Sequence, residues 1–213
     1  MTEHGERLYL VRPLEKSDIP TLTRWFFDLE DLSTFDRSAR IPISLEASEK
    51  TWSDALGNDR KNGKYWFAID DAETNTIGIV GLESHSVING DAVISLYIVG
   101  PERRRGVGVR TVALLSDVAF KQLGLHRITS YYHADNEGSR KLTARVGFEV
   151  EGRMRQAWFS GGQRADMVVV GLLKKDWFER RTALTSELDT DTIVSFGVIA
   201  SPVWSWPLKD ADG

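Results

Sequence analysis

Cysteine is absent from all 213 residues of the sequence. Its absence excludes disulfide bonds, thiolate metal sites and a cysteine nucleophile, and it leaves the redox compartment undetermined. No apolar run approaches the roughly 20 residues that a membrane-spanning helix requires, so no membrane partner is expected. The first seven residues do not resemble a secretory signal, and a cytoplasmic location is therefore expected.

An excess of positive charge is also absent. The chain carries 27 Lys and Arg residues against 31 Asp and Glu residues, which gives a formal net charge of −4. This balance argues against a dedicated nucleic-acid-binding protein, although a local basic patch could still bind an anionic ligand. With 41% hydrophobic and 27% charged residues, the composition is typical of a globular chain with one domain, or with one domain and an appendage.

Two common hydrolase signatures are missing as well. The four histidines do not form a His-Glu-x-x-His pattern, and the chain has no Gly-x-Ser-x-Gly elbow. A zinc enzyme or a serine hydrolase therefore has little support, and no metal cofactor is expected.

The apolar patterns predict an α/β (α+β) chain with the order β-α-α-β-β-β-α-β-α-β-β. Strands are expected at residues 8–14, 65–69, 76–82, 92–99 and 128–132, from Phe148 onward, and in a hairpin of 156–160 with 165–173. Helices are expected from Ser17 through the apolar positions 22, 25, 26 and 29, and at 44–56, 109–123 and 137–145.

The character of the chain changes near Arg181. We therefore expect one domain at residues 7–181 and a C-terminal extension at residues 182–213. The extension contains a strand pattern at 192–199, followed by Trp204 and Trp206. A solvated tail would not need two tryptophans, so this arm is expected to pack on its own body or on a second subunit.

The segment that carries chemistry is Arg103-Arg-Arg-Gly-Val-Gly108, which lies between an apolar strand and a helix. A helix N-terminus with free N–H groups, two glycines that let a phosphate approach and three arginines suggest a polyanion site, such as one for a diphosphate. A dinucleotide fingerprint would need glycine at Thr111, and a P-loop would need Lys-Ser/Thr directly after Gly108. A tight turn with merely solvated arginines remains the simpler alternative.

The pattern Arg103-x-x-Gly106-x-Gly108 resembles the Q/R-x-x-G-x-G/A signature of the GNAT acyltransferases. Other segments, in order and spacing, resemble the ribosomal-protein N-acetyltransferase (RimJ/RimL-like) branch of that family, over roughly residues 7–180. These segments are Gly124-Leu-His-Arg-Ile128, Asn136-Glu-Gly-Ser139, Val146-Gly-Phe-Glu-Val-Glu-Gly-Arg153 and Trp158-Phe-Ser-Gly-Gly-Gln-Arg-Ala-Asp166.

The resemblance implies a GNAT fold, with a mixed, mostly antiparallel central sheet flanked by helices, and acetyl-CoA as cosubstrate. It implies that the fourth and fifth strands splay apart and that the thioester enters the gap. Pantetheine contacts would come from Leu96, Ile98 and Val99 on the strand edge and from Asn136 and Ser139. The pyrophosphate would lie on the loop and the helix start, formed by Arg103, Arg104, Arg105, Gly106, Val107, Gly108 and Val109.

The implied activity is direct transfer of an acetyl group to a primary amine, which would be a protein N-terminus, a peptide or a small amine. A homodimer is one option. The Ile98 or Val99 amide is the candidate donor to the developing negative charge. The structural alternative for Asn136 is an ordinary helix N-cap, which is compatible with ligand contact.

Two departures from the family pattern affect the catalytic residues. Thr143 stands where many members have a tyrosine acid, so Ser139 or an ordered water becomes the candidate acid. Val93 stands where many relatives have a glutamate, so the base must come from elsewhere, and the candidates are Glu83, His85, Tyr131 and His133. The alternatives are a catalytically weak CoA-binding module of the same fold and a pure interaction protein that uses the tryptophan-bearing tail.

Overall fold

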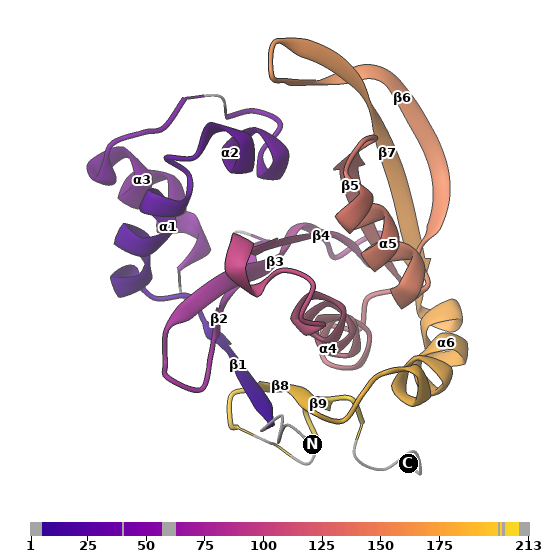
Figure 1. The fold of residues 1–213 in the computed structure, drawn as a ribbon. Helices are drawn as coiled ribbons and strands as arrows, with labels where there is room; N and C mark the ends of the chain where they lie inside the picture. The colour runs from indigo at the N-terminus through magenta and orange to yellow at the C-terminus, as the bar shows by residue number, and fades with distance from the viewer. Residues whose placement is uncertain (1–5, 40, 57–62, 200, 202, 209–213) are drawn as a thin grey trace, which may run out of the picture.

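The computed structural model describes residues 6–39, 41–56, 63–199, 201 and 203–208 (Figure 1). Nine strands form one sheet with the order β6-β7-β5-β4-β3-β2-β1-β8-β9. The strands are β1 (Arg7–Pro13), β2 (Tyr65–Asp70), β3 (Thr76–Ser86), β4 (Asp91–Ile98), β5 (Arg127–His133), β6 (Glu149–Ser160), β7 (Gln163–Leu173), β8 (Thr192–Phe196) and β9 (Ser205–Trp206). Only the β1–β8 and β4–β5 pairs are parallel within this sheet.

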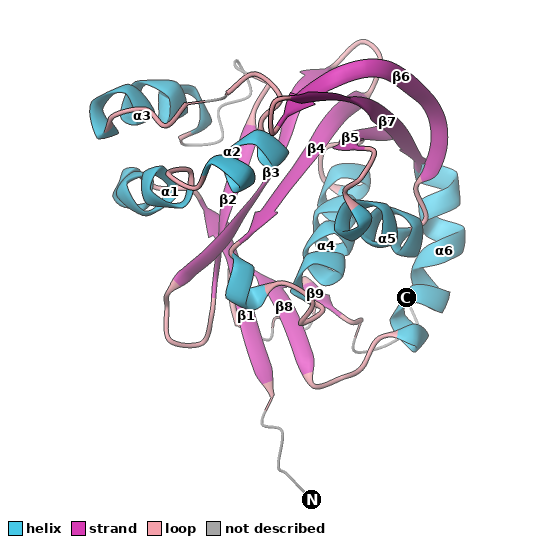
Figure 2. Cartoon of the chain, turned by 45° about the horizontal axis from the view of Figure 1, so that its top comes forward, coloured by secondary structure: helices cyan, strands magenta, loops and turns pink. Residues whose placement is uncertain are grey.

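Helices cover both faces of the sheet (Figure 2). One face carries α1 (Ile19–Trp25), α2 (Leu29–Phe35) and α3 (Leu45–Trp52), and the other carries α4 (Val107–Lys121), α5 (Glu137–Val146) and α6 (Lys174–Glu187). Single 3₁₀ turns lie at Lys16–Asp18, Ser53–Ala55 and Gly100–Glu102. The expected mixed, mostly antiparallel sheet flanked by helices is thereby confirmed. None of the helices in the described ranges is long and apolar enough to cross a membrane.

Each face of the sheet has its own apolar core. The larger core packs α4 against the sheet through residues such as Val112, Leu115 and Phe120. The smaller core packs α1 against the opposite face through Ile19 and Leu22. Because successive residues of a strand point to opposite faces, one strand serves both cores. The sheet therefore separates the two layers of helices.

Three elements differ from those expected. Helix α2 was not expected, and the expected strand at Phe148 and the first hairpin strand form one long β6 with a bulge between Met154 and Trp158. Helix α6 was not expected either, and it extends through Arg181, where the domain boundary was placed. In α6 only Trp177 and Leu184 are buried, so the sequence shows no continuous apolar stripe there.

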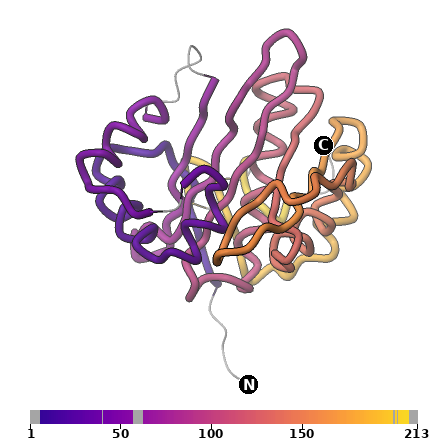
Figure 3. Tube along the Cα trace, turned by 90° about the horizontal axis from the view of Figure 1, so that it is seen from above, coloured from indigo at the N-terminus to yellow at the C-terminus, as the bar shows by residue number. Residues whose placement is uncertain are grey.

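The part of the chain that follows α6, called the C-terminal segment below, packs on the body of its own chain. Strand β8 pairs in parallel with β1, and β9 pairs with β8 at the end of the sheet. Trp206 is fully buried, and its ring lies 5.3 Å from that of Trp177. The β6–β7 hairpin reaches from the other end of the sheet to α2 (Figure 3), where the Trp158 indole N–H donates to the Ser33 carbonyl at 2.8 Å.

An ion-pair network joins β1 to the first helical turn. Arg12 donates to Asp18 at 2.8 Å and to Asp70 at 2.6 Å, and Asp18 also accepts from the Glu15 N–H at 2.8 Å. Burial would raise the pKa of Asp18, but the hydrogen bonds from Arg12 and Glu15 and the Arg12 charge outweigh it. They hold that pKa below its ordinary value of 3.8. Ionisation of Asp18 therefore stabilises the folded state above that value, and the contribution is lost as the pH falls.

We predict that Asp18→Asn lowers the free energy of unfolding at pH 7 by about 1–3 kcal/mol, since a charge-assisted bond is replaced by a weaker one. The difference between the two proteins should begin to shrink as the pH falls below 3.8, where the unfolded chain binds the proton, and should be lost once the pH falls through the lowered pKa of folded wild type. Urea unfolding at pH 7 and pH 3 measures both. An equal deficit at the two pH values would contradict this account.

Candidate active site

The fourth and fifth strands separate halfway along their length. β4 and β5 pair only at three positions, from Asp91 with Arg127 to Val93 with Thr129. Beyond these positions β4 continues beside β3 as far as Ile98, and β5 continues beside β7 as far as His133. The splay that the resemblance implied therefore begins directly after Val93.

The backbone of β4 presents alternate groups to this gap. The Val99 N–H donates to the Ile77 carbonyl at 2.9 Å, so Val99 faces β3. Since backbone polar groups alternate along a strand, Leu96 and Ile98 direct theirs toward the gap. The Val99 N–H is already bonded to β3, which corrects the expectation that it donates to the ligand, and the Ile98 N–H remains the candidate donor to a developing negative charge.

The loop after β4, residues 103–108, is called the anion loop below. Arg104 and Gly106 have left-handed backbone angles, with φ of 67° and 83°. Gly106 is the N-cap residue of α4, and it has no side chain to bond the first helical N–H groups. These groups are therefore available to an anion, and the exposed Arg104 and Arg105 add positive charge beside them. The residues present fit a diphosphate.

Gly108 also has a packing role. A Cβ atom on it would lie 3.0 Å from Cδ1 of Leu142 on α5 and 3.3 Å from Cδ2 of Leu96 on β4. Glycine at this position therefore lets α5 and β4 pack closely on α4. The expected approach of a phosphate to the Gly108 backbone stays a prediction.

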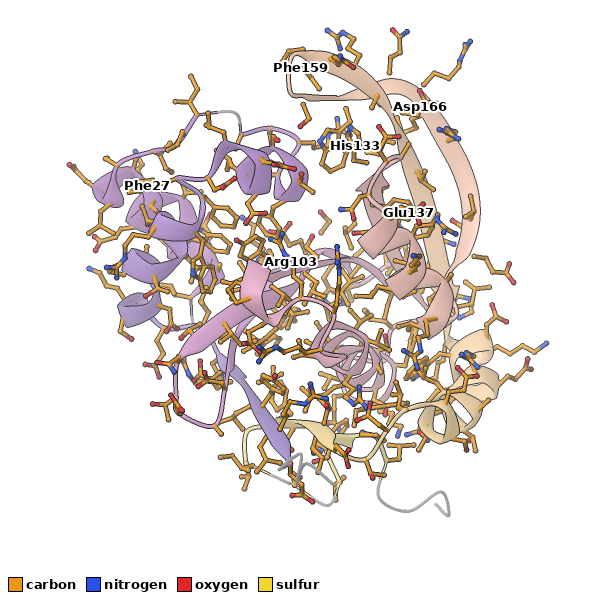
Figure 4. All side chains as sticks on the ribbon, in the orientation of Figure 1. Phe27, Arg103, His133, Glu137, Phe159 and Asp166 are labelled. Carbon is orange, nitrogen blue, oxygen red and sulfur yellow. The ribbon has the colours of Figure 1, made fainter. Side chains whose placement is uncertain are left out.

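Arg103 connects the anion loop to α2 (Figure 4). Its Nε donates to the Ile98 carbonyl and its Nη2 to Asp31 Oδ1, each at 2.7 Å. The Tyr97 hydroxyl donates to Asp31 Oδ2 at 2.7 Å, and burial together with this carboxylate raises the pKa of Tyr97. The side chain of Arg103 thus holds the loop. Arg104, the backbone N–H groups and Arg105, which also pairs with Glu102 at 3.0 Å, remain the candidates for binding a phosphate.

Asn136 and Ser139 lie in the first turn of α5. The Asn136 side-chain oxygen accepts from the Ser139 N–H at 2.9 Å, so Asn136 caps the helix and keeps its amide NH₂ group for a ligand. The Thr143 hydroxyl donates to the Ser139 carbonyl at 2.8 Å and is therefore used within the helix. Thr143 is therefore not free to act as the tyrosine of the resembled family does, and Ser139 remains the candidate acid on this side of the sheet.

A pocket of about 480 Å³ opens on the face that carries α1–α3. Glu83 and Tyr131, two of the expected catalytic residues, both line it. Glu83 Oε1 accepts from the Trp66 indole N–H at 3.0 Å, which fixes this carboxylate at the pocket wall. The residues of β4 that reach the pocket are Val93, Ile94 and Ser95, where the strands begin to separate. The pocket therefore meets the gap between β4 and β5.

The structure divides the expected catalytic residues between two sides. Glu83 and Tyr131 line the pocket, whereas Ser139 lies on α5, which covers the opposite face. His85 and His133 are not among the pocket-lining residues. Arg37, Lys64 and Trp158 also line the pocket, and no local pattern in the sequence indicates this, because they come from segments far apart in the chain. In the described ranges, no three His, Asp or Glu side chains form a group that could hold a metal ion.

Comparison with known proteins gives a family match. A model described as "Acetyltransferase (GNAT) domain" matches residues 7–149. The [ribosomal protein uS5]-alanine N-acetyltransferase of Escherichia coli is 31% identical over 117 residues, which cover 53% of this chain and 59% of the relative. An N-acetyltransferase of Bacillus subtilis named YoaA is 30% identical over 115 residues, which cover 54% of this chain and 64% of the relative. The chain thus spans less than two thirds of the length of these relatives.

Solved structures share the fold. The spermidine N-acetyltransferase of Vibrio cholerae, in complex with CoA and spermine, superposes with a TM-score of 0.72. The identity is 22%, and the superposition covers 80% of this chain and 98% of that chain. At this identity the likeness concerns the arrangement of the elements and not the acceptor.

Proposed function

The chain belongs to the GNAT acetyltransferase family, and we propose that it transfers an acetyl group from acetyl-CoA directly to the primary amine of a peptide or protein N-terminus. The observation that carries this proposal is that the gap between β4 and β5 has the anion loop at the end of β4 and the Glu83 pocket where the two strands separate. The loop offers a diphosphate site on one face of the sheet. The pocket offers a carboxylate to an ammonium group on the other.

The residues take separate parts in the reaction. Acetyl-CoA supplies the activated acetyl group. Glu83 accepts a proton from the ammonium form of the amine, directly or through water, because only the neutral amine can attack. The Ile98 N–H stabilises the negative charge that develops on the thioester oxygen. Ser139 donates a proton to the sulfur as the carbon–sulfur bond breaks, and no bond to the enzyme forms.

The charges of the pocket favour a monoamine over a polyamine. Two acidic residues, Asp36 and Glu83, and two basic residues, Arg37 and Lys64, line it together with aromatic rings. An extended polycation would meet the two basic side chains, whereas an N-terminal amine brings one charge. The name of the uS5 relative, which acts on an alanine of a ribosomal protein, also supports a peptide acceptor and the RimJ/RimL-like branch.

Thiol release tests the proposal and its acceptor. Acetyl-CoA with a short peptide that has a free N-terminal alanine should release CoA, and the same peptide with an acetylated N-terminus should not. Spermidine should react with about ten-fold lower kcat/KM, since like charges in the pocket oppose its binding. Faster reaction with spermidine would contradict the peptide assignment.

A weak CoA-binding module is the second candidate, and the Val93 and Thr143 positions favour it. Calorimetric binding of acetyl-CoA without thiol release on any amine would support this candidate against the first. The expected cytoplasmic location and homodimer stay predictions.

A further inference from the structure

Arg110 is fully buried in the first turn of α4, directly behind the anion loop. Arginine is rarely buried completely, because a desolvated cation requires partners that replace its water. Burial lowers the pKa of Arg110, and the Asp189 carboxylate opposes this shift. The side chain therefore depends on the groups that surround it.

The partners of Arg110 are Gly106, in the anion loop, and Asp189, in the C-terminal segment. Nη1 of Arg110 donates to the Gly106 carbonyl at 3.2 Å, within the anion loop. Nη2 donates to the Asp189 carbonyl at 2.6 Å and lies 3.1 Å from the Asp189 carboxylate. Asp189 precedes β8, and its carboxylate also accepts from the Thr192 N–H at 3.1 Å, at the start of that strand. One guanidinium group thus joins the loop to the C-terminal segment.

The loop is shaped around this guanidinium group. Gly106 has a left-handed conformation, and a Cβ atom there would collide with Nη1 of Arg110. Arg110 donates to the carbonyl of Gly106, which is the N-cap residue of α4. The backbone turn at Gly106 directs the N–H groups that follow it toward a ligand. If Arg110 moved, the turn at Gly106 would lose its only side-chain hydrogen bond among those found in the described ranges.

We propose that Arg110 and Asp189 are positioning residues through which the C-terminal segment holds the anion loop in its ligand-binding conformation. This inference rests on the proposed function, in which the loop binds the diphosphate of acetyl-CoA. Asp189 lies outside residues 7–149, which the family model matches. The C-terminal segment is thereby assigned a part in binding the cosubstrate, beyond extending the sheet.

Steady-state kinetics and calorimetry with acetyl-CoA test the inference on the full chain. Arg110→Met keeps an unbranched side chain but removes both sets of hydrogen bonds, and it should raise KM and Kd for acetyl-CoA about ten-fold. The value of kcat at saturating acetyl-CoA should stay within about two-fold of wild type, because Arg110 touches no reacting atom. Asp189→Ala keeps the backbone contact and should raise KM about three-fold.

Two control variants separate positioning from general loosening. Asp191→Ala removes an exposed charge from the same segment, and it should leave KM unchanged. Trp206→Phe loosens the segment where it contacts Asp117, away from the loop, and should lower the melting temperature without raising KM. If Arg110→Met does not fold, the KM values of Asp189→Ala and Asp191→Ala for acetyl-CoA test the positioning role.

The outcomes are distinguishable. If the wild-type protein gives no heat with acetyl-CoA, the proposed function itself fails. If the wild type binds and the Arg110 and Asp189 variants bind equally well, the positioning role is overturned. An equal rise of KM in Trp206→Phe would overturn it too, because loosening anywhere in the segment would then suffice.

Discussion

Replacing Glu83 with glutamine should lower kcat by roughly 100-fold or more, which is the usual contribution of a general base. The variant keeps an oxygen that can accept from the Trp66 indole N–H, so the pocket should keep its shape. Binding of acetyl-CoA should not change, since Glu83 lies on the acceptor face and the anion loop on the other. Thiol release and calorimetry measure the two effects separately.

The pH profile of Glu83→Gln distinguishes loss of a base from loss of structure. An N-terminal amine has a pKa of about 7.7–8.0, so its neutral form becomes abundant without help above that range. The deficit of the variant should therefore shrink as the pH rises. Glu149→Gln, at an exposed carboxylate of β6, is the matched control and should retain full activity. A deficit that stays constant with pH would contradict the role of Glu83 as a base.

The other two candidate catalytic residues are Tyr131 and Ser139. Tyr131 shares the pocket with Glu83, so Tyr131→Phe tests whether the phenol contributes to proton removal. Ser139 would assist departure of a thiolate, which is a weak base and needs less help from an acid than a departing amide or alkoxide does. Removal of the Ser139 hydroxyl should therefore lower kcat less than removal of the Glu83 carboxylate. An effect of this size at Ser139 would accord with the absence of a tyrosine acid at Thr143.

The anion loop and its flanking elements could be predicted from the sequence because their determinants are local. The apolar stripe of α4, the Asn136 cap of α5 and its end at Gly147 are all contained in short windows. The same holds for the strand that enters the loop. These segments carry the signals on which the GNAT resemblance depends, so family and fold followed from them.

The parts that were missed depend on tertiary contacts. Helix α2 has seven residues and buries only Leu32 and Ser33, which is too few for a visible apolar face. Strand β6 contains a bulge at Gln156, which has a left-handed conformation. The bulge interrupts the alternation of the sequence, which therefore predicts two separate strands. The bond of Asp31 to Arg103 spans 72 residues, and that of Arg110 to Asp189 spans 79. No local pattern reports which distant carboxylate a given arginine will meet.

Substitution of Asp117 with alanine should lower the free energy of unfolding by about 3–5 kcal/mol, because it removes the partner of the Arg181 cation, whose side chain is 14% exposed, and of two buried indole N–H groups. Asp117 is 3% exposed on α4 and accepts from Trp177 at 3.0 Å, from Trp206 at 3.2 Å and from Arg181 at 2.9 Å. One carboxylate therefore anchors both α6 and the C-terminal strand to α4. Urea unfolding measures the loss, and Glu179→Ala, at an exposed carboxylate of α6, is the matched control. If the two variants lost equal stability, Asp117 would not be the anchor, and the C-terminal segment would be held by its strand pairing with β1 alone.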